Sequence, residues 1–302
     1  MEENSMKRKY MIIVLMAGAL ELTGCSQGTS NSAKNGTTGS ENTIISESDI
    51  AILDTEDMFT ERDRDTEYDE SECTAISLSD EETKCDSDGV KMDGQTVTIT
   101  EGGTYLLTGS LSNGSVVVDT DKTEKVQLIL ENVSIINEEG AGICVEQADK
   151  VFITLADGST NKIVSNSFTG NEDTNIDGAI FSREDLTLNG SGTLKITSAA
   201  HGIVSKDDLV LTGGVYQIQS EKQGLSGKES VRIADGTFTI TSGTDAIHSE
   251  DTDEDTKGFV YITGGVLTLA AGGDGISSSY VVQADGGSFD ISTSSTETDT
   301  ST

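Results

Sequence analysis

The sequence predicts an all-β, single-domain parallel β-helix (a β-solenoid) with about 22 residues per turn. Three observations predict this fold class: apolar and glycine positions recur at a fixed period, apolar residues alternate with polar ones, and the chain has 33 glycines but no proline. Proline removes a hydrogen-bond donor wherever it falls in a continuous sheet, so its absence suits a chain of stacked strands.

The period is clearest in the second half of the chain. Steps of 22, 22, 29 and 22 residues separate the glycines that precede a strand, Gly192, Gly214, Gly236, Gly265 and Gly287. The same steps separate the apolar column Ile196, Ile218, Ile240, Leu269 and Ile291, and steps of 22, 22 and 29 separate Ile203, Leu225, Ile247 and Ile276. One unit is therefore 22 residues, and one corner carries a seven-residue insertion between Ile247 and Val260.

Within each unit the apolar residues alternate, as in LVLTGGVYQI and VRIADGTFTI. This is the periodicity of strands and not of helices. A 22-residue unit holds two or three short strands and cannot bury its own apolar face, so neighbouring units must stack about 4.8 Å apart.

The start of the chain predicts a secreted lipoprotein. The stretch MKRKYMIIVLMAGALELTGCS has a basic cluster, an apolar segment too short to span a membrane, and small residues before one cysteine, and it resembles the bacterial lipobox. We expect a lipoprotein signal peptide at 1–24, a lipid on Cys25, a flexible Ser/Gly/Asn/Thr-rich tether over 25–46, and the β-helix over 47–302, with an acidic N-terminal cap region at 47–95. The alternative is an ordinary cleaved signal with an incidental cysteine. In both cases we expect an extracellular protein, and in the first case Cys25 would anchor it to the cell membrane.

Composition and charge limit the partners. The formal net charge of -34 excludes nucleic acid and anionic lipid as binding partners, so the membrane is met only through the anchor. The sequence has no Ser/His/Asp grouping, no Gly-rich phosphate loop and no CxxC or HxxxH spacing. Among the other cysteines, Cys73 and Cys85 could pair, whereas Cys144 is expected to be a small buried hydrophobe.

Several segments together resemble a known family: GTYLLTGSL, LENVSI, DGAIFSREDLTLNGSGTLKI, HGIVSKDDLVLTGG, DAIHSEDTDEDTKGFVYITGG and GGDGISSSY. They are similar to secreted carbohydrate-binding parallel β-helix proteins of polysaccharide-degrading anaerobic bacteria, and the resemblance runs from about Phe59 to the C-terminus. It implies a calcium-containing protein that binds plant cell-wall polysaccharides, including pectin and cellulose, and that is related in fold to the family 9 pectate lyases.

The acidic insertion predicts a calcium (Ca2+) site. Carboxylates a few ångströms apart repel each other unless a cation neutralises them, and calcium takes six to eight oxygen ligands in flexible geometry. The insertion has DxDxD spacing, although Thr256 and Ile262 replace the turn glycine and the bidentate glutamate of a helix-loop-helix calcium site. A solvated acidic loop is the alternative. The predicted metal ligands, including one residue from each of two neighbouring units, are Asp245, Glu250, Asp251, Asp253, Asp255 and Asp274.

A second column contains alternating charges, with the basic residues Arg183, Lys206 and Lys228 beside the acids Glu184, Asp207 and Glu229. It can be interpreted as a basic strip for uronate carboxylates, as the lysine base of a lyase, or as a structural charge ladder, and the ladder is favoured because no apolar pocket is evident. The two histidines, His201 and His248, are expected to be a surface turn group and a polar strand-end residue.

The function predicted from these features is non-catalytic, calcium-dependent polysaccharide binding at the bacterial cell surface. The expected ligand is an acidic plant polysaccharide such as polygalacturonate, bridged to protein carboxylates through calcium, because the chain has no tryptophan and 4% aromatic residues for ring stacking. We expect a monomer that is not an enzyme. The alternatives are a pectate-lyase-like polysaccharide lyase and a structural or adhesin β-solenoid.

Overall fold

The computed structural model describes residues 13–15, 53–168 and 175–294. Apart from residues 13–15, the predicted signal peptide (1–24) and the tether (25–46) with Cys25 lie outside the described residues. No helix in the described ranges is long and apolar enough to cross a membrane.

The described chain is almost entirely β, with the single short helix α1 (Glu61–Arg64). Its strands form two sheets, of sixteen and nine strands in the described ranges, and neither sheet closes on itself. All pairings between these strands are parallel except β3 with β4. The prediction of an all-β chain with parallel sheets is therefore confirmed.

The sixteen-stranded sheet has two arms that meet in the long strands β5 and β7, because the first half of β7 pairs with β9 and its second half pairs with β10. The first arm contains β1 (Ile13–Leu15), β2 (Thr74–Leu78), β5 (Gly103–Leu111), β7 (Lys125–Asn137), β9 (Lys150–Leu155), β12 (Asp185–Gly190), β15 (Asp208–Leu211), β18 (Ser230–Ile233), β21 (Phe259–Ile262) and β24 (Val282–Ala284). The second arm contains β10 (Thr160–Ser165), β13 (Thr193–Ser198), β16 (Val215–Ser220), β19 (Thr237–Ser242), β22 (Val266–Ala271) and β25 (Ser288–Thr293). The nine-stranded sheet contains β3 (Val90–Asp93), β4 (Thr96–Ile99), β6 (Ser115–Asp119), β8 (Ile143–Gln147), β11 (Gly178–Ser182), β14 (His201–Ser205), β17 (Leu225–Gly227), β20 (Ile247–Ser249) and β23 (Ile276–Ser278).

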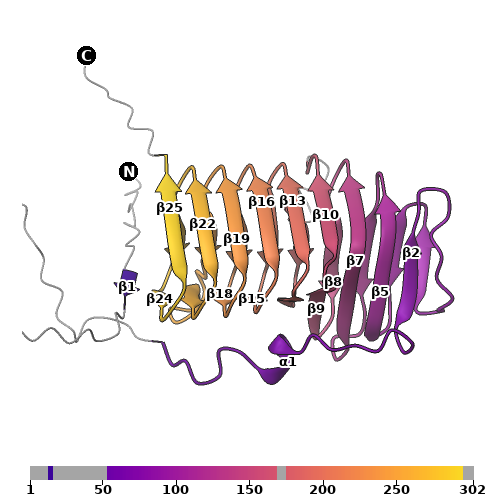
Figure 1. The fold of residues 1–302 in the computed structure, drawn as a ribbon, viewed down its shortest axis with the longest axis horizontal. Coiled ribbons are helices and arrows are strands. Elements are labelled where there is room, and N and C mark those ends of the chain that lie inside the picture. Colours follow the sequence, from indigo (N-terminus) through magenta and orange to yellow (C-terminus); the bar gives the residue numbers. More distant parts are fainter. Residues whose placement is uncertain (1–12, 16–52, 169–174, 295–302) are drawn as a thin grey trace, which may run out of the picture.

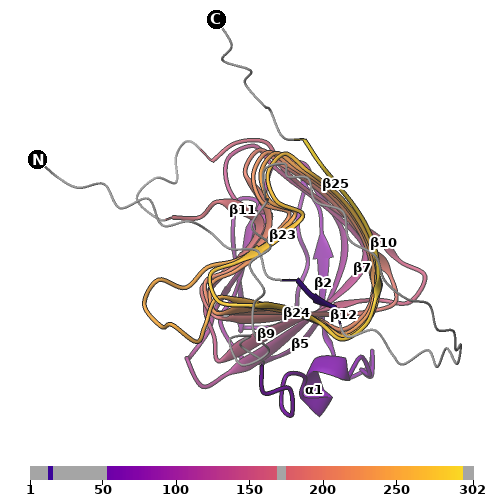
Figure 2. The same ribbon diagram turned by 90° about the vertical axis from the view of Figure 1, so that its left-hand side faces the viewer.

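The register of the second arm repeats the period of the sequence. Thr193 pairs with Val215 and Val215 with Thr237, steps of 22 residues, and Thr237 pairs with Val266 across the insertion, a step of 29. The strands lie side by side along the long axis of the molecule (Figure 1). Seen along that axis, the two arms and the nine-stranded sheet form three sides around the interior (Figure 2).

The core fills this interior because alternate residues of each strand point inward. In β16, Tyr216 and Ile218 are buried while Gln217 between them is exposed. The ring of Tyr216 stacks on that of Phe238 in the neighbouring β19, with centroids 4.9 Å apart and 7° between the planes. Cys144 is buried, as predicted, and Cys73 and Cys85 are free thiols in this structure.

The acidic N-terminal region divides into two parts. Residues 74–99 form β2, β3 and β4 at the end of the sheets. Residues 53–69, which we call the strap, instead cross the outer side of the first arm, and α1 lies there outside the strands (Figures 1 and 2). The strap begins at β24, where the Leu53 N–H donates to the Gln283 side chain (3.0 Å), and it reaches β7, where Arg62 donates to Gln127 (2.8 Å).

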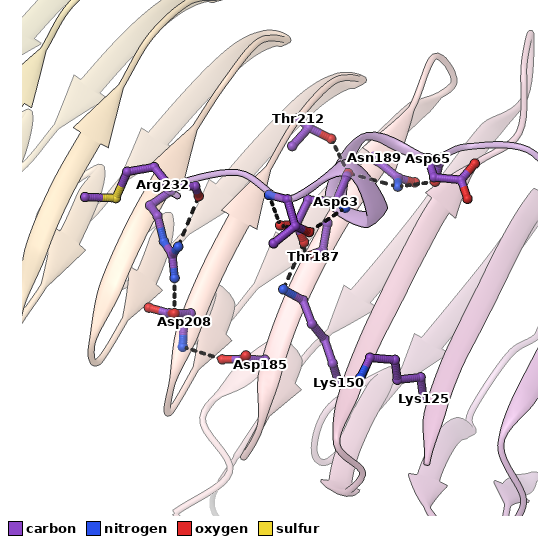
Figure 3. A network of polar contacts seen from close by, with 12 residues as sticks. Asp63, Asp65, Lys125, Lys150, Asp185, Thr187, Asn189, Asp208, Thr212 and Arg232 are labelled. Atoms are coloured by element: carbon purple, nitrogen blue, oxygen red, sulfur yellow. Dashed lines mark hydrogen bonds and ion pairs between the residues drawn. The ribbon is translucent and has the colours of Figure 1, made fainter. Parts of the chain in front are cut away.

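The centre of the strap is fixed by the carboxylate of Asp63, which is only 2% exposed (Figure 3). Its Oδ1 lies 2.9 Å from the Lys150 ammonium and accepts a hydrogen bond from Thr187 (2.7 Å). Its Oδ2 accepts from the backbone N–H and hydroxyl of Thr60, which caps α1. Although burial raises the pKa of Asp63, the hydrogen bonds and charge of Lys150 outweigh it and lower the pKa to about 2. The strap is therefore held by a paired, buried charge.

Candidate carbohydrate-binding cleft

A cleft of about 290 Å³ lies on the nine-stranded sheet, where β11, β14, β17 and β20 are neighbours. Strand alternation places its floor: Ile203 and Ile247 point into the core, so the next residue in each strand, Val204 and His248, points outward. The residues around the cleft come from consecutive strands and turns: Asp177, His201, Val204, Ser205, Lys206, Gln223, Ser226, Gly227, Lys228, His248 and Glu250.

The outward column changes character along the axis. Phe181 in β11 and Val204 in β14 are buried in a small apolar cluster, whereas Ser226 and His248 follow in β17 and β20. Arg183 and Lys206 lie over the Phe181 ring at 5.5 and 5.4 Å. The cleft therefore has an apolar end covered by cations and a polar end that contains an imidazole.

One wall of the cleft is formed by a histidine paired with a carboxylate. His201 Nε2 lies 3.3 Å from Asp177 Oδ2, and the Lys206 ammonium lies 3.7 Å from Asp177 Oδ1. Burial alone would raise the pKa of Asp177, but the hydrogen bond from His201 and the nearby positive charges outweigh it and lower that pKa. The side chain of His201 is 13% exposed, so it is a wall residue and not the surface turn group expected from the sequence.

The second histidine is also held by acids. His248 Nδ1 lies 2.8 Å from Ser277 Oγ and 3.2 Å from Asp245 Oδ2, and its Nε2 lies 3.7 Å from Glu250. The Ser277 hydroxyl donates to Asp245 Oδ2 (2.6 Å). Burial raises the pKa of Asp245, but the hydrogen bonds from His248 and Ser277 outweigh it and lower that pKa well below its usual range. His248 is therefore orientated by a network of three polar neighbours.

The lysines of the alternating-charge column both line the cleft. Lys206 approaches Asp177, and Lys228 Nζ lies 2.8 Å from Asp253 Oδ2 and 3.9 Å from Asp251 Oδ2. The hydrogen bond to Asp253 raises the pKa of Lys228. The neighbouring acids, Asp207 and Glu229, do not line the cleft, and Glu229 forms an ion pair with Lys257. Burial and the negative charges of Asp185 and Glu229 raise the pKa of Asp207 to about 6. The column thus contributes cations to the cleft and stacks its acids outside it.

Three lining residues carry buried polar atoms without a hydrogen-bond partner. Four such side-chain atoms occur in the described ranges: Asp177 Oδ1, His201 Nδ1, Gln223 Oε1 and Ser165 Oγ. Because buried polar groups are nearly always satisfied, a concentration of three in one cleft marks a place where water or a ligand completes the hydrogen bonding.

The predicted calcium ligands are only partly brought together. The Asp274 N–H donates to Asp245 Oδ1 (2.8 Å), so these two units do meet, but through a backbone group. Asp251 Oδ1 accepts from the N–H groups of Asp253 (2.7 Å) and Glu254 (3.0 Å). Glu250 faces His248, and Asp255 is exposed. Among the residues that the structure describes, no three His, Cys, Asp or Glu side chains form a group able to hold a metal ion.

Asp177 and Gln223 were missed as site residues by sequence reasoning. The signal was present, because Gln223 occupies the column in which His201 and Asp245 also lie, directly before a glycine or alanine near the start of a strand.

Comparison with known proteins agrees with a carbohydrate-binding role. A family model described as carbohydrate-binding domain-containing protein matches residues 93–302. A carbohydrate-binding domain-containing protein of Acetivibrio thermocellus is 34% identical over 137 residues, which cover 44% of this chain and 48% of the relative, so the match spans about half of that relative's length. A solved structure described as a polysaccharide lyase-like protein from C. thermocellum, in a gadolinium derivative, is 30% identical with a TM-score of 0.66, covering 72% of this chain and 100% of the solved one. The chain belongs to the family of carbohydrate-binding domain-containing proteins.

Proposed function

We propose that this protein binds an acidic polysaccharide such as polygalacturonate, without catalysis, through the cleft on β11, β14, β17 and β20. The observation that carries the proposal is the gathering of Lys206 and Lys228 with both histidines of the chain around one cleft. In a protein with a net charge of -34, two ammonium groups on one strip of surface are the natural attachment point for anionic sugars.

Different residues of the cleft would contact different chemical groups of the polysaccharide. The ammonium groups of Lys206 and Lys228 donate charge-assisted hydrogen bonds to uronate carboxylates. Asp177 Oδ1 and Gln223 Oε1, which lack a hydrogen-bond donor within the described part of the protein, would accept hydrogen bonds from sugar hydroxyls. Binding through ion pairs and hydrogen bonds needs no aromatic side chain on which a sugar ring stacks, in keeping with a chain that contains no tryptophan.

The proposal includes the finer architecture and the location. A parallel β-helix, in which each 22-residue turn adds one strand to each of three sides, is supported by the register between partner strands. Such a fold presents a long, rigid surface to an extended polymer. A lipid anchor at Cys25 would hold a monomer at the outer surface of the cell, within reach of the polysaccharide.

Calcium is not used in this proposal, because the predicted ligands as arranged do not fit the ion. The Lys228 ammonium lies 2.8 Å from Asp253 Oδ2 and 3.9 Å from Asp251 Oδ2, and Asp251 Oδ1 accepts two backbone N–H groups, so these carboxylates already have protein donors. Calcium dependence stays a prediction from the sequence, and a titration with and without a chelator tests it.

A lyase is the second candidate, favoured by the two lysines in the cleft and by the likeness to a polysaccharide lyase-like protein. A lysine that abstracts a proton must be neutral, and catalytic bases work best when their pKa lies near the operating pH. The hydrogen bond to Asp253 instead raises the pKa of Lys228. This favours Lys228 as a permanent cation over Lys228 as a base.

The test is calorimetric titration of polygalacturonate into the protein and into Lys206→Gln and Lys228→Gln. Each substitution removes one charge-assisted contact, so we expect each to weaken binding by about tenfold. Lys195→Gln is the matched control, since Lys195 lies exposed on β13 in the second arm. Equal affinities for all four proteins would refute the cleft as the binding site. Formation of unsaturated product on prolonged incubation with polygalacturonate would show that the protein is a lyase and not only a binding protein.

A further inference from the structure

Lys228 is shared between the cleft and the acidic insertion. It lines the cleft, yet its ammonium lies 2.8 Å from Asp253 Oδ2. The other cleft lysine, Lys206, stands one strand earlier, and its neighbours among the described residues include Asp177 at 3.7 Å and the Phe181 ring. One cation of the cleft is therefore engaged by a carboxylate from the insertion, and the other is engaged only at longer range.

The insertion keeps its shape through residues other than Asp253. The side chain of Asp251 is 2% exposed and accepts two backbone N–H groups of the loop, while its own N–H donates to Ser279 Oγ (3.1 Å). Lys257 ties the far end of the loop to Glu229. The Asp253 side chain is 72% exposed and has Lys228 as its only ion-pair partner in the described ranges. Changing Asp253 thus alters the cleft and leaves the loop in place.

We propose that Asp253 is a specificity-determining residue that competes with the anionic group of the ligand for Lys228. This inference rests on the proposed function of the cleft. A bound uronate carboxylate must take the hydrogen bond that Asp253 holds, and it also meets the negative charge of Asp253 close by. A neutral sugar meets neither cost, so the insertion lowers the preference of the cleft for acidic over neutral polysaccharide.

The sign of this effect separates it from calcium bridging. If the insertion held calcium for the ligand, loss of the Asp253 carboxylate would weaken binding. Competition for Lys228 predicts the opposite result. An exposed ion pair of this kind corresponds to a change in affinity of about two- to fivefold, which should shrink at high salt.

The experiment is titration of polygalacturonate into wild-type protein and Asp253→Asn, with a chelator present, at low and high salt. We expect Asp253→Asn to bind about two- to fivefold more tightly at low salt. Asp290→Asn is the matched control, because it removes the same charge from exposed β25 in the second arm. In the double variant Lys228→Gln with Asp253→Asn, the gain should disappear relative to Lys228→Gln alone.

Each outcome decides the inference. Tighter binding by Asp253→Asn, but not by Asp290→Asn, supports it. Equal or weaker binding by Asp253→Asn, with wild-type binding intact, overturns the inference and leaves the proposed function standing. No binding by either protein overturns both. A gain that persists in the double variant would show that Asp253 acts through general charge and not through Lys228, which also overturns it.

Discussion

Replacing Asp63 by asparagine tests how strongly the strap is fastened to the first arm. The substitution keeps the shape of the side chain and removes the charge that faces Lys150 at 2.9 Å. Figure 3 shows how contacts with the strap converge here: Thr187 and Lys150 meet the carboxylate, and Thr212 and Asn189 donate to the Asp63 carbonyl. The change therefore leaves the Lys150 ammonium, which is 16% exposed, without its counterion.

The size of the effect can be worked out in two ways. Removing one partner of a buried ion pair costs about 3–5 kcal/mol, and the partial exposure of Lys150 places this case at the lower end. A pKa lowered from 3.8 to about 2 on folding corresponds to about 2 kcal/mol. The two values agree on about 2–3 kcal/mol at neutral pH.

The pH dependence has a definite sign. Because the folded-state pKa of Asp63 is the lower one, its contribution is complete above the unfolded-state pKa near 4 and is lost as the pH falls through about 2. The difference in stability between wild type and Asp63→Asn should therefore be full at pH 7 and should shrink between about pH 4 and pH 2.

Urea unfolding followed by circular dichroism at pH 7, 5 and 3 measures this difference through the midpoints. Asp65→Asn is the control on the same strap, because the exposed pair of Asp65 with Arg62 is worth at most about 1 kcal/mol. Equal midpoints for wild type and Asp63→Asn at pH 7, or a difference that does not change with pH, would refute the assignment of a stabilising buried charge.

Three further predictions concern the core, the insertion and calcium. Phe238→Ala should lower the free energy of unfolding by about 3–5 kcal/mol, and a loss below that of Phe238→Leu in urea melts would contradict the stacked-ring core. Gly258 has φ of 71° and a Cβ there would lie 2.0 Å from Ser279 Oγ, so Gly258→Ala should destabilise more than Gly94→Ala, where φ is 61° and nothing lies within 4 Å; equal melting temperatures would count against this. Titrations of polygalacturonate with calcium and with chelator separate two hypotheses: the lysine cleft alone predicts equal affinities, and heat seen only with calcium would support the calcium bridging predicted from the sequence.

The repeat made most of the fold predictable from the sequence. The columns of Ile196 and Ile203 place one inward residue per unit on each of two sides, and both columns are buried in the core except at the last strand, where Ile291 is 41% exposed. The strap could not be predicted, because its contacts are remote: Asp63 bonds to Thr187, 124 residues away, and the segment around it shows only an excess of acids. The charge composition of a segment does not identify the residues that it will contact. The position of the strap therefore cannot be predicted before the sheet on which it lies is known.

Several residues of the candidate site could be identified from the sequence, but the fact that they lie together around one cleft could not. The sequence shows both lysines of the column and both histidines, yet each residue taken singly is more often structural than functional. His201 and His248 belong to different units and to different columns, and the cleft appears only when β14, β17 and β20 are placed side by side. Stacking, and not local sequence, creates the site.

The acidic insertion shows that charge density alone does not decide between a metal site and a solvated acidic loop. Two carboxylates 4 Å apart repel by about 4 kcal/mol near a protein surface but by only about 1 kcal/mol in water, so exposed acids need no metal ion. Asp253 and Asp255 are exposed, and only Asp251 is buried. Hydrogen bonds from the Asp253 and Glu254 N–H groups, together with the charge of Lys228, lower the pKa of Asp251 and stabilise its charge. Lys228 is the cation next to Asp251 and Asp253 and it also lines the cleft, so the insertion and the candidate site share one side chain.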